Sequence, residues 1–207
     1  MGTQAHAMMR TRLFAAGAMI MMGGLLGVGI AGAAETFTID SVHSSVGFKI
    51  RHLFSHVSGR FADFDGTLKY DAEQPEKSSI ELVIQAESID TDNQRRDDHL
   101  RSEDFFHVAE HPTITFKSTK IVPGEKPNRY RVTGDFTMRG VTKPVTIDVE
   151  MLGFAEIPGM GYRGGFDAST TLDRKDYGVE WNKVLDTGGA ILGDEVAIDC
   201  SIQVVRS

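Results

Sequence analysis

Apolar and polar residues alternate along most of the chain beyond Ala34, in runs of about five to ten residues. A period of two is that of a β-strand with one buried face, whereas segments with the period of a helix are nearly absent. The alternation therefore predicts an all-β fold. The clearest runs cover residues 46–50, 80–86, 114–116, 130–138, 145–151, 166–172 and 196–204.

Turn-forming residues separate these runs and leave about eight strands joined by short links. This pattern is typical of an up-and-down antiparallel barrel or of a sandwich. Each run has a single apolar face and no second sheet is evident, so we predict an eight-stranded antiparallel up-and-down barrel, wide enough to enclose one small ligand. Phe61 and Phe64 break the period of two, which predicts a bulge or bend near Ala62 and Asp63.

One short helix is expected within residues 91–102, where Thr91 and Gln94 fit a capping box and Asp97 precedes Arg101 by four positions. Its sides are polar except at Leu100, so we expect it on the surface at one end of the barrel. The two phenylalanines that follow it could close that end or line an entrance.

The N-terminal region predicts export. Two arginines precede an apolar run over residues 13–30 that ends in Ala31-Gly32-Ala33. This is typical of a cleaved signal peptide over residues 1–33, with a non-native start over residues 1–7, although an uncleaved membrane anchor is the alternative. The remaining residues 34–207 form one domain, which we expect to be secreted into a bacterial periplasm without stable membrane insertion.

Charge and cysteine usage exclude several classes of function. The net charge is −7 and the basic residues are scattered, so nucleic acid is not an expected partner. The single cysteine, Cys200, lies in an apolar phase and permits neither an internal disulfide nor a thiolate metal site. No G-x-S-x-G elbow or nucleotide-binding glycine motif is present, so we expect neither an enzyme nor a cofactor.

Histidines are the remaining candidates for metal ligands. His52 and His56 would share a face only if the chain between them were helical, and we expect solvent-facing histidines and no metal site instead. The histidines beyond residue 33 are His43, His52, His56, His99, His107 and His111.

The barrel interior is the candidate binding site, since 12 phenylalanines and one tryptophan supply a deformable apolar lining. Small residues in the inward phase would leave room for a ligand; these are Gly66, Ala86, Gly134 and Ala168. The alternative that the side chains simply fill the barrel stays open. The predicted ligand-binding residues are Phe48, Phe64, Leu82, Ile84, Phe105, Phe106, Phe116, Phe136, Met138, Phe166 and Trp181.

Several ordered segments between residues 36 and 205 together resemble the YceI-like family, often called polyisoprenoid-binding proteins. Each segment is weak alone, but their order and spacing are specific. The segments that carry the resemblance are FTIDSVHS (37–44), GRF (59–61), FDGT (64–67), SIDT (88–91), DHLRSEDFF (98–106), PTITF (112–116), GDFTMRGVTKPV (134–145), DRKDYG (173–178) and GDEV (193–196).

The resemblance implies an extended lipocalin-like barrel that holds an isoprenoid chain or another long amphiphile. We therefore predict a periplasmic carrier for a polyisoprenoid, an isoprenoid quinone or a similar lipid, with Arg51, His52 and Arg101 as candidates to meet the headgroup. The alternative is a stress-response or protein-interaction module with a filled barrel. A homodimer through exposed strands or the helix stays open, as does the question of which barrel end is the mouth.

Overall fold

A computed structural model describes residues 34–184 and 190–207. The predicted signal peptide, residues 1–33, lies outside the described residues. Among those described, no helix is both long and apolar enough to cross a membrane. The strands are β1 (Glu35–Ile39), β2 (Ser45–His52), β3 (Ser55–Phe61), β4 (Phe64–Tyr70), β5 (Ser79–Gln85), β6 (Ile89–Asp90), β7 (Thr113–Pro123), β8 (Arg129–Met138), β9 (Val141–Ile157), β10 (Gly161–Asp173) and β11 (Leu192–Arg206).

Between these strands the chain forms one α-helix and four short 3-10 turns within the described residues. These elements are η1 (Ser41–His43), η2 (Pro75–Lys77), η3 (Ala86–Ser88), α1 (Gln94–Arg101) and η4 (Arg174–Tyr177).

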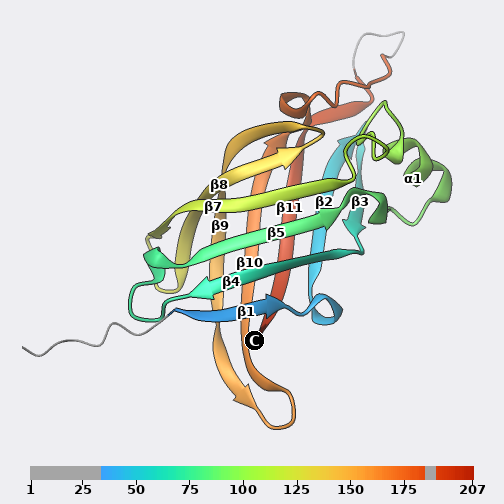
Figure 1. The fold of residues 1–207 in the computed structure, drawn as a ribbon. Helices are drawn as coiled ribbons and strands as arrows, with labels where there is room; N and C mark the ends of the chain where they lie inside the picture. The colour runs from blue at the N-terminus through green and yellow to red at the C-terminus, as the bar shows by residue number, and fades with distance from the viewer. Residues whose placement is uncertain (1–33, 185–189) are drawn as a thin grey trace, which may run out of the picture. The chain divides into compact units, whose positions relative to one another are not determined.

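The strands form one antiparallel sheet that closes through pairing between β1 and β11 (Figure 1). Three pairs of consecutive strands each act as one long strand with a bend; the pairs are β1 with β2, β3 with β4, and β5 with β6. The first pair lies along β11, because β1 and β2 both pair with it. The second pair lies along the first (β4 on β1, β3 on β2), and the third lies along the second (β5 on β4, β6 on β3). With β7 to β11, the sheet is an eight-stranded up-and-down barrel, and the predicted fold class is confirmed.

The three bends lie at corresponding positions in neighbouring strands. The first is η1, the second is the irregular pair Ala62 and Asp63, and the third is η3. The second bend explains the phase break in the sequence, because Phe61 and Phe64 are both buried although they are three residues apart. The predicted bend is therefore present, and it lets one strand turn a corner while both of its halves keep an apolar inner face.

Helix α1 lies at one end of the barrel, between the short strand β6 and β7 (Figure 1). Its N-cap is Asn93, whose side chain accepts a hydrogen bond from the backbone N–H of Arg96 at 3.1 Å. The expected capping box at Thr91 was therefore wrong. Thr91 instead donates its backbone N–H and its hydroxyl to the buried carboxylate of Asp97, which ties the helix to the end of β6.

The β8–β9 hairpin turns on Arg139 and Gly140, with φ angles of 51° and 74°. Met138 pairs with Val141, so the loop has two residues, and two positive φ angles are the geometry of a type I′ turn. The guanidinium of Arg139 donates to the backbone carbonyls of Glu103 and Gly178. This arginine therefore fastens the hairpin to the segments on either side of it at the α1 end of the barrel.

Candidate functional site

The interior of the barrel is not filled. A cavity of about 460 Å³ lies at the α1 end, and a smaller chamber of about 150 Å³ lies towards the opposite end of the barrel. The two adjoin, because they share the lining residues Leu82, Phe116, Ile147, Thr170, Ile198 and Cys200. Along β11 the lining runs from Val196 in the larger cavity to Val204 in the smaller chamber, a span of about 26 Å at 3.3 Å per residue.

Most of the apolar residues predicted to bind ligand line this interior. Phe166 faces the smaller chamber, and Leu82 and Phe116 face both. Phe64 is the exception, since it is 5% exposed and packs in the core beside the cavity. The predicted residues on the wall of the larger cavity are Phe48, Leu82, Ile84, Phe105, Phe106, Phe116, Phe136, Met138 and Trp181.

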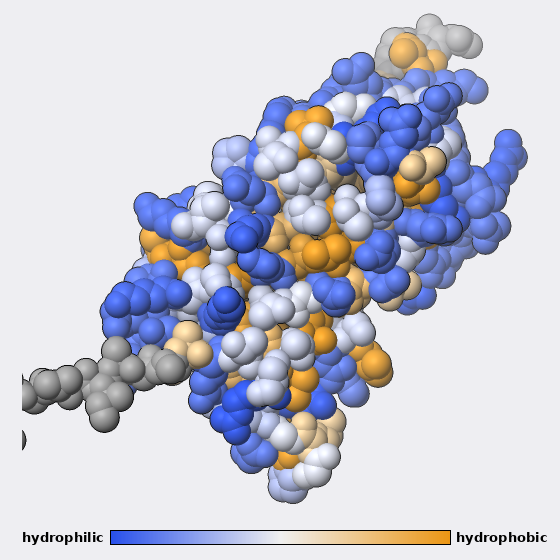
Figure 2. All heavy atoms as spheres, in the orientation of Figure 1, coloured by the Kyte–Doolittle hydropathy of each residue, from blue (hydrophilic) through white to orange (hydrophobic). Residues whose placement is uncertain are grey.

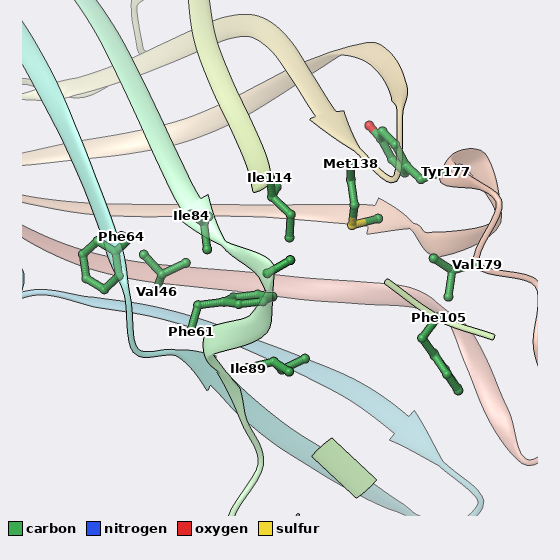
Figure 3. Close-up of a cluster of buried hydrophobic side chains, with 11 residues drawn as sticks. Val46, Phe61, Phe64, Ile84, Ile89, Phe105, Ile114, Met138, Tyr177 and Val179 are labelled. Carbon is green, nitrogen blue, oxygen red and sulfur yellow. The ribbon is translucent and has the colours of Figure 1, made fainter. Parts of the chain in front are cut away.

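The packed core around the larger cavity draws on separate strands and on the segment after α1. Val46, Phe61 and Ile114 come from β2, β3 and β7, and Figure 3 shows them projecting towards a common interior. Phe105 and Val179 lie together in another part of the same cluster. This convergence follows from the alternation in the sequence, because every strand turns its apolar phase inward.

The inward glycines do not create the space. A Cβ atom on Gly134 would lie 2.6 Å from the Phe116 ring, and one on Gly66 would lie 2.8 Å from the side chain of Ile39. Ala86 is buried in the packed core, so of the four small residues only Ala168 faces a chamber. The expectation that these glycines leave room for a ligand was wrong, because neighbouring side chains cover them.

Aromatic rings pack around Phe154 at the end of the barrel opposite α1. Its ring lies 5.2 Å from Phe37, 4.7 Å from Tyr70, 5.8 Å from Tyr162 and 5.6 Å from Phe166, measured between centroids. Phe37 is fully buried beneath this cluster. The smaller chamber abuts the cluster at Tyr70 and Phe166, so aromatic rings form part of its wall.

Polar groups reach the cavity at the α1 end. Arg95, Arg96 and His99 project from the helix onto the wall of the larger cavity, and Asn93 lies at the helix start. Arg95 is exposed, so the cavity meets the surface here. The smaller chamber has no charged side chain among its described lining residues. The interior is thus polar at one end and apolar at the other.

Neighbouring groups hold two of these helix residues in place. Arg96 donates to the Thr91 hydroxyl and to the Thr91 carbonyl, each at 2.7 Å. His99 bonds the Asp104 carboxylate through Nε2 at 2.8 Å, and its ring stands edge-on to Phe105 and Trp181 at 5.0 and 4.9 Å. Sequence reasoning missed these residues because the helix was expected to face only solvent.

Of the three headgroup candidates, only His52 lines the cavity. Arg51 is exposed, because neighbouring residues in a strand point to opposite faces. Arg101 donates to the carbonyls of Glu87 and Ile89, each at 2.8 Å, and so joins α1 to the strand before it. The structure therefore brings His52, but not the two arginines, to the cavity wall.

Arg174 is a buried arginine on the same wall, with 4% of its surface exposed. Its guanidinium donates to the carbonyls of Gly193, Val179 and Trp181 at 2.9, 2.7 and 2.8 Å. It also approaches the Asp194 carboxylate at 3.4 Å. The network joins η4, the following segment and the start of β11, so we assign Arg174 a structural role.

Cys200 faces the junction of the two chambers. Burial raises the pKa of its thiol to about 11, and hydrogen bonding to the backbone of Gly47 offsets this only in part. The thiol is therefore protonated near neutral pH and weakly nucleophilic.

The β2–β3 hairpin contains His52 and His56, the pair of histidines considered as metal ligands. Arg51 pairs with His56 and His52 pairs with Ser55, so His56 shares a face with Arg51 and lies on the opposite face from His52. This pair cannot chelate one ion.

The outer surface mixes charged and apolar residues (Figure 2). Several apolar side chains are exposed. Leu152 lies in β9, Met160 lies in the turn between β9 and β10, and Phe54 lies at the β2–β3 turn. In Figure 2 apolar residues are visible at the tip of the β9–β10 hairpin, which projects at the bottom of the view in Figure 1.

Comparisons with known proteins agree with this architecture. A UPF0312 protein of Azotobacter vinelandii is 40% identical over 192 residues, which cover 91% of this chain and 96% of the relative. The crystal structure of BcnA from Burkholderia cenocepacia matches with a TM-score of 0.71 and 25% identity, covering 80% of this chain and 98% of that one.

A third match shows the fold alone. It is a polyisoprenoid binding domain from Saccharophagus degradans implicated in plant cell wall breakdown, with a TM-score of 0.60 and 16% identity over 83% of this chain and 98% of that one. The model of the YceI-like domain matches residues 37–204, which is nearly all of the described barrel. The chain therefore belongs to the YceI-like family.

Proposed function

We propose that this protein binds a long-chain lipid inside the barrel, with the tail in the smaller, uncharged chamber and the headgroup beside α1. The polyisoprenoids, isoprenoid quinones and lipids of similar shape are the ligand class. One observation carries the proposal: two adjoining chambers run along the barrel, one with no charged lining residue among those described and one with Arg95, Arg96 and His99 on its wall. The solved domain described as polyisoprenoid binding shares the same fold.

The apolar wall supplies the driving force. Each buried methylene contributes about 0.8 kcal/mol, so ten of them would contribute roughly 8 kcal/mol before the costs of association and ordering are subtracted. A headgroup at the rim would add less, because Arg95 is exposed and its attraction for an anion is screened by solvent. Affinity should therefore depend on tail length more than on headgroup charge.

The open interior favours binding over the alternative of a filled barrel. Native interiors pack to crystal density with few voids larger than a water molecule, and a cavity of about 460 Å³ lies within the range of ligand pockets. A binding role is also favoured over catalysis, since the thiol at the chamber junction is held protonated by its raised pKa. We accordingly propose a carrier and not an enzyme.

We also propose that the protein works in the periplasm after removal of residues 1–33. The apolar run and the small-residue triplet at its end support this location. N-terminal sequencing of the protein from a periplasmic fraction tests it: a mature chain that begins at Ala34 is expected, and a full-length chain in the membrane fraction would contradict it.

The first test of binding is native mass spectrometry of protein isolated from its own cells, with lipid analysis of any released ligand. We expect one lipid per barrel. A protein that is empty, and that also fails to take up added isoprenoid quinones and long-chain lipids, would refute the proposal.

A second test separates tail from headgroup with geranylgeranyl diphosphate and geranylgeraniol, which share one tail. Phe136→Asp, which places a carboxylate on the cavity wall, should abolish binding of both, whereas Leu152→Asp on the outer surface should change neither. Arg95→Gln should weaken only the diphosphate, by about fivefold (about 1 kcal/mol), and less at high salt. Equal losses for the alcohol would show that α1 does not meet the headgroup.

A further inference from the structure

Three potential metal ligands occur within five residues between α1 and β7. The sequence there reads His107-Val108-Ala109-Glu110-His111, and one ligand atom from each of His107, Glu110 and His111 lies within 4.8 Å of the other two. None of the three lines the lipid cavity, so this cluster is separate from the proposed binding site.

The backbone of this segment forms a single helical turn that brings the ligands together. The N–H groups of Glu110 and His111 both donate to the carbonyl of His107, at 3.0 and 2.9 Å. Residues three and four apart in such a turn lie side by side. The turn thus places two imidazoles and a carboxylate on one side without requiring a long helix.

The turn itself is anchored at both ends. The N–H of His107 donates to the Ser102 carbonyl and that of Val108 to the Arg101 carbonyl, while the carbonyl of Pro112 accepts from Ala86. These bonds fix the backbone of the segment between the end of α1 and the start of β7. A binding ion would therefore meet a turn whose backbone is already ordered.

The His111 ring is packed in place, whereas the Glu110 carboxylate is exposed. The His111 ring packs against Gly140 so closely that a Cβ atom there would lie 2.9 Å from its Cε1. The rings of His107 and His111 stand 5.8 Å apart, nearly perpendicular. The Glu110 side chain is 69% exposed and lies 3.8 Å from His107 Nδ1, so small rotations could complete a coordination sphere.

We propose that His107, Glu110 and His111 bind a divalent transition metal of the zinc class. Two imidazoles and one carboxylate match the ligand preference of zinc, nickel and copper. Zinc–nitrogen distances of about 2.0–2.1 Å require the donor atoms to approach each other by roughly 1 Å or more from the upper limit observed here. Water would complete the coordination. The turn directly follows Phe105 and Phe106, so the ion would brace a segment that lines the larger cavity.

The test is a titration of the full mature chain, free of any affinity tag, with Zn²⁺ by calorimetry and with Co²⁺ by visible absorption. We expect one ion per chain at micromolar protein concentration. His107→Asn and His111→Asn should each weaken binding at least tenfold, and asparagine tolerates the positive φ of 49° at position 107. His56→Asn, an exposed histidine in the β2–β3 hairpin, is the matched control and should leave binding unchanged.

Nuclear magnetic resonance of the unaltered protein provides a readout that needs no variant. On addition of Zn²⁺, the ring signals of His107 and His111 should shift while those of His56 do not. The proposal is overturned if no stoichiometric binding occurs, if the shifts fall on other histidines, or if both asparagine variants fold and bind as well as the wild type.

Discussion

The rate at which Cys200 reacts shows whether its thiol lies in an apolar barrel interior. The thiol lies where the two chambers meet, and burial raises its pKa to about 11. At pH 8 about 0.1% of such a thiol is ionised, whereas about a quarter of a free cysteine with a pKa near 8.5 is ionised. Since the thiolate is the nucleophile, ionisation alone should slow the reaction of Cys200 about 200-fold relative to a free thiol.

The assay is the rate of reaction with a chromogenic disulfide in lipid-free protein, measured from pH 7.5 to 10. The rate at Cys200 should rise about tenfold per pH unit across this range, because the pKa lies above it. A matched control moves the thiol one residue, to the exposed outer face, in the double variant Cys200→Ser/Ser201→Cys. Its rate should be fast and should level off near pH 9.

Ligand occupancy supplies the second half of this prediction. Geranylgeranyl diphosphate should slow the reaction of Cys200 further, because this thiol faces the cavity. The thiol at position 201 in the control variant faces outward, so its rate should not change. A wild-type rate within tenfold of the control, or a plateau near pH 9, would refute the assignment of Cys200 to a closed apolar interior. An unchanged rate with bound lipid would place the ligand outside the barrel.

Three further variants test the packing. Asp40→Asn should cost about 2–3 kcal/mol at pH 7, since the Arg163 guanidinium beside Asp40 holds the pKa of that mostly buried carboxyl below its usual range. This contribution is present above the unfolded pKa near 4 and is lost as the pH falls towards the lower folded pKa. In urea unfolding, the difference in free energy of unfolding between the variant and the wild type should therefore narrow between pH 6 and pH 3. A difference that stays constant would show that the Asp40–Arg163 pair does not cause it. Arg174→Met should lower the free energy of unfolding by about 3–5 kcal/mol, because three carbonyls lose their donor, and an unchanged urea midpoint would contradict the structural role. Gly134→Ala should lower Tm by about 4–8 °C, equivalent to a loss of about 2 kcal/mol in the free energy of unfolding. The reason is that the added Cβ would lie 2.5 Å from the Lys117 carbonyl oxygen. An unchanged Tm in calorimetry would refute this close packing.

The strands could be predicted from sequence because each buries one face, and alternation records which face that is. The bend after Phe61 could be predicted for the same reason, since a spacing of three between two apolar residues is incompatible with a straight strand. The joining of six short strands into three long ones could not, because it depends on pairings with partners far along the chain. Those pairings leave no periodic signal of their own.

The candidate site was harder to predict than the fold. Apolar lining residues follow the inward phase, so most of the predicted ones face the cavity. The glycines misled because no pattern reveals that a distant Phe116 ring covers Gly134. Arg95 and Arg96 were missed because a polar helix has the same composition whether it faces solvent alone or also a cavity rim. The histidines at residues 107–111 match no metal motif in the sequence, and only the fold shows that the backbone between them closes on itself.

The two ends of the barrel differ in how regular they are. At the end opposite α1, β1 pairs with both β4 and β11, and an aromatic cluster packs beside it. At the α1 end, β6 pairs with β3 over only two residues, and a helix and loops take the place of sheet between β6 and β7. Segments with few ladder hydrogen bonds open at a lower free energy than central strands. The polar rim and the larger cavity therefore coincide with this irregular wall, and the proposed function places the lipid headgroup there.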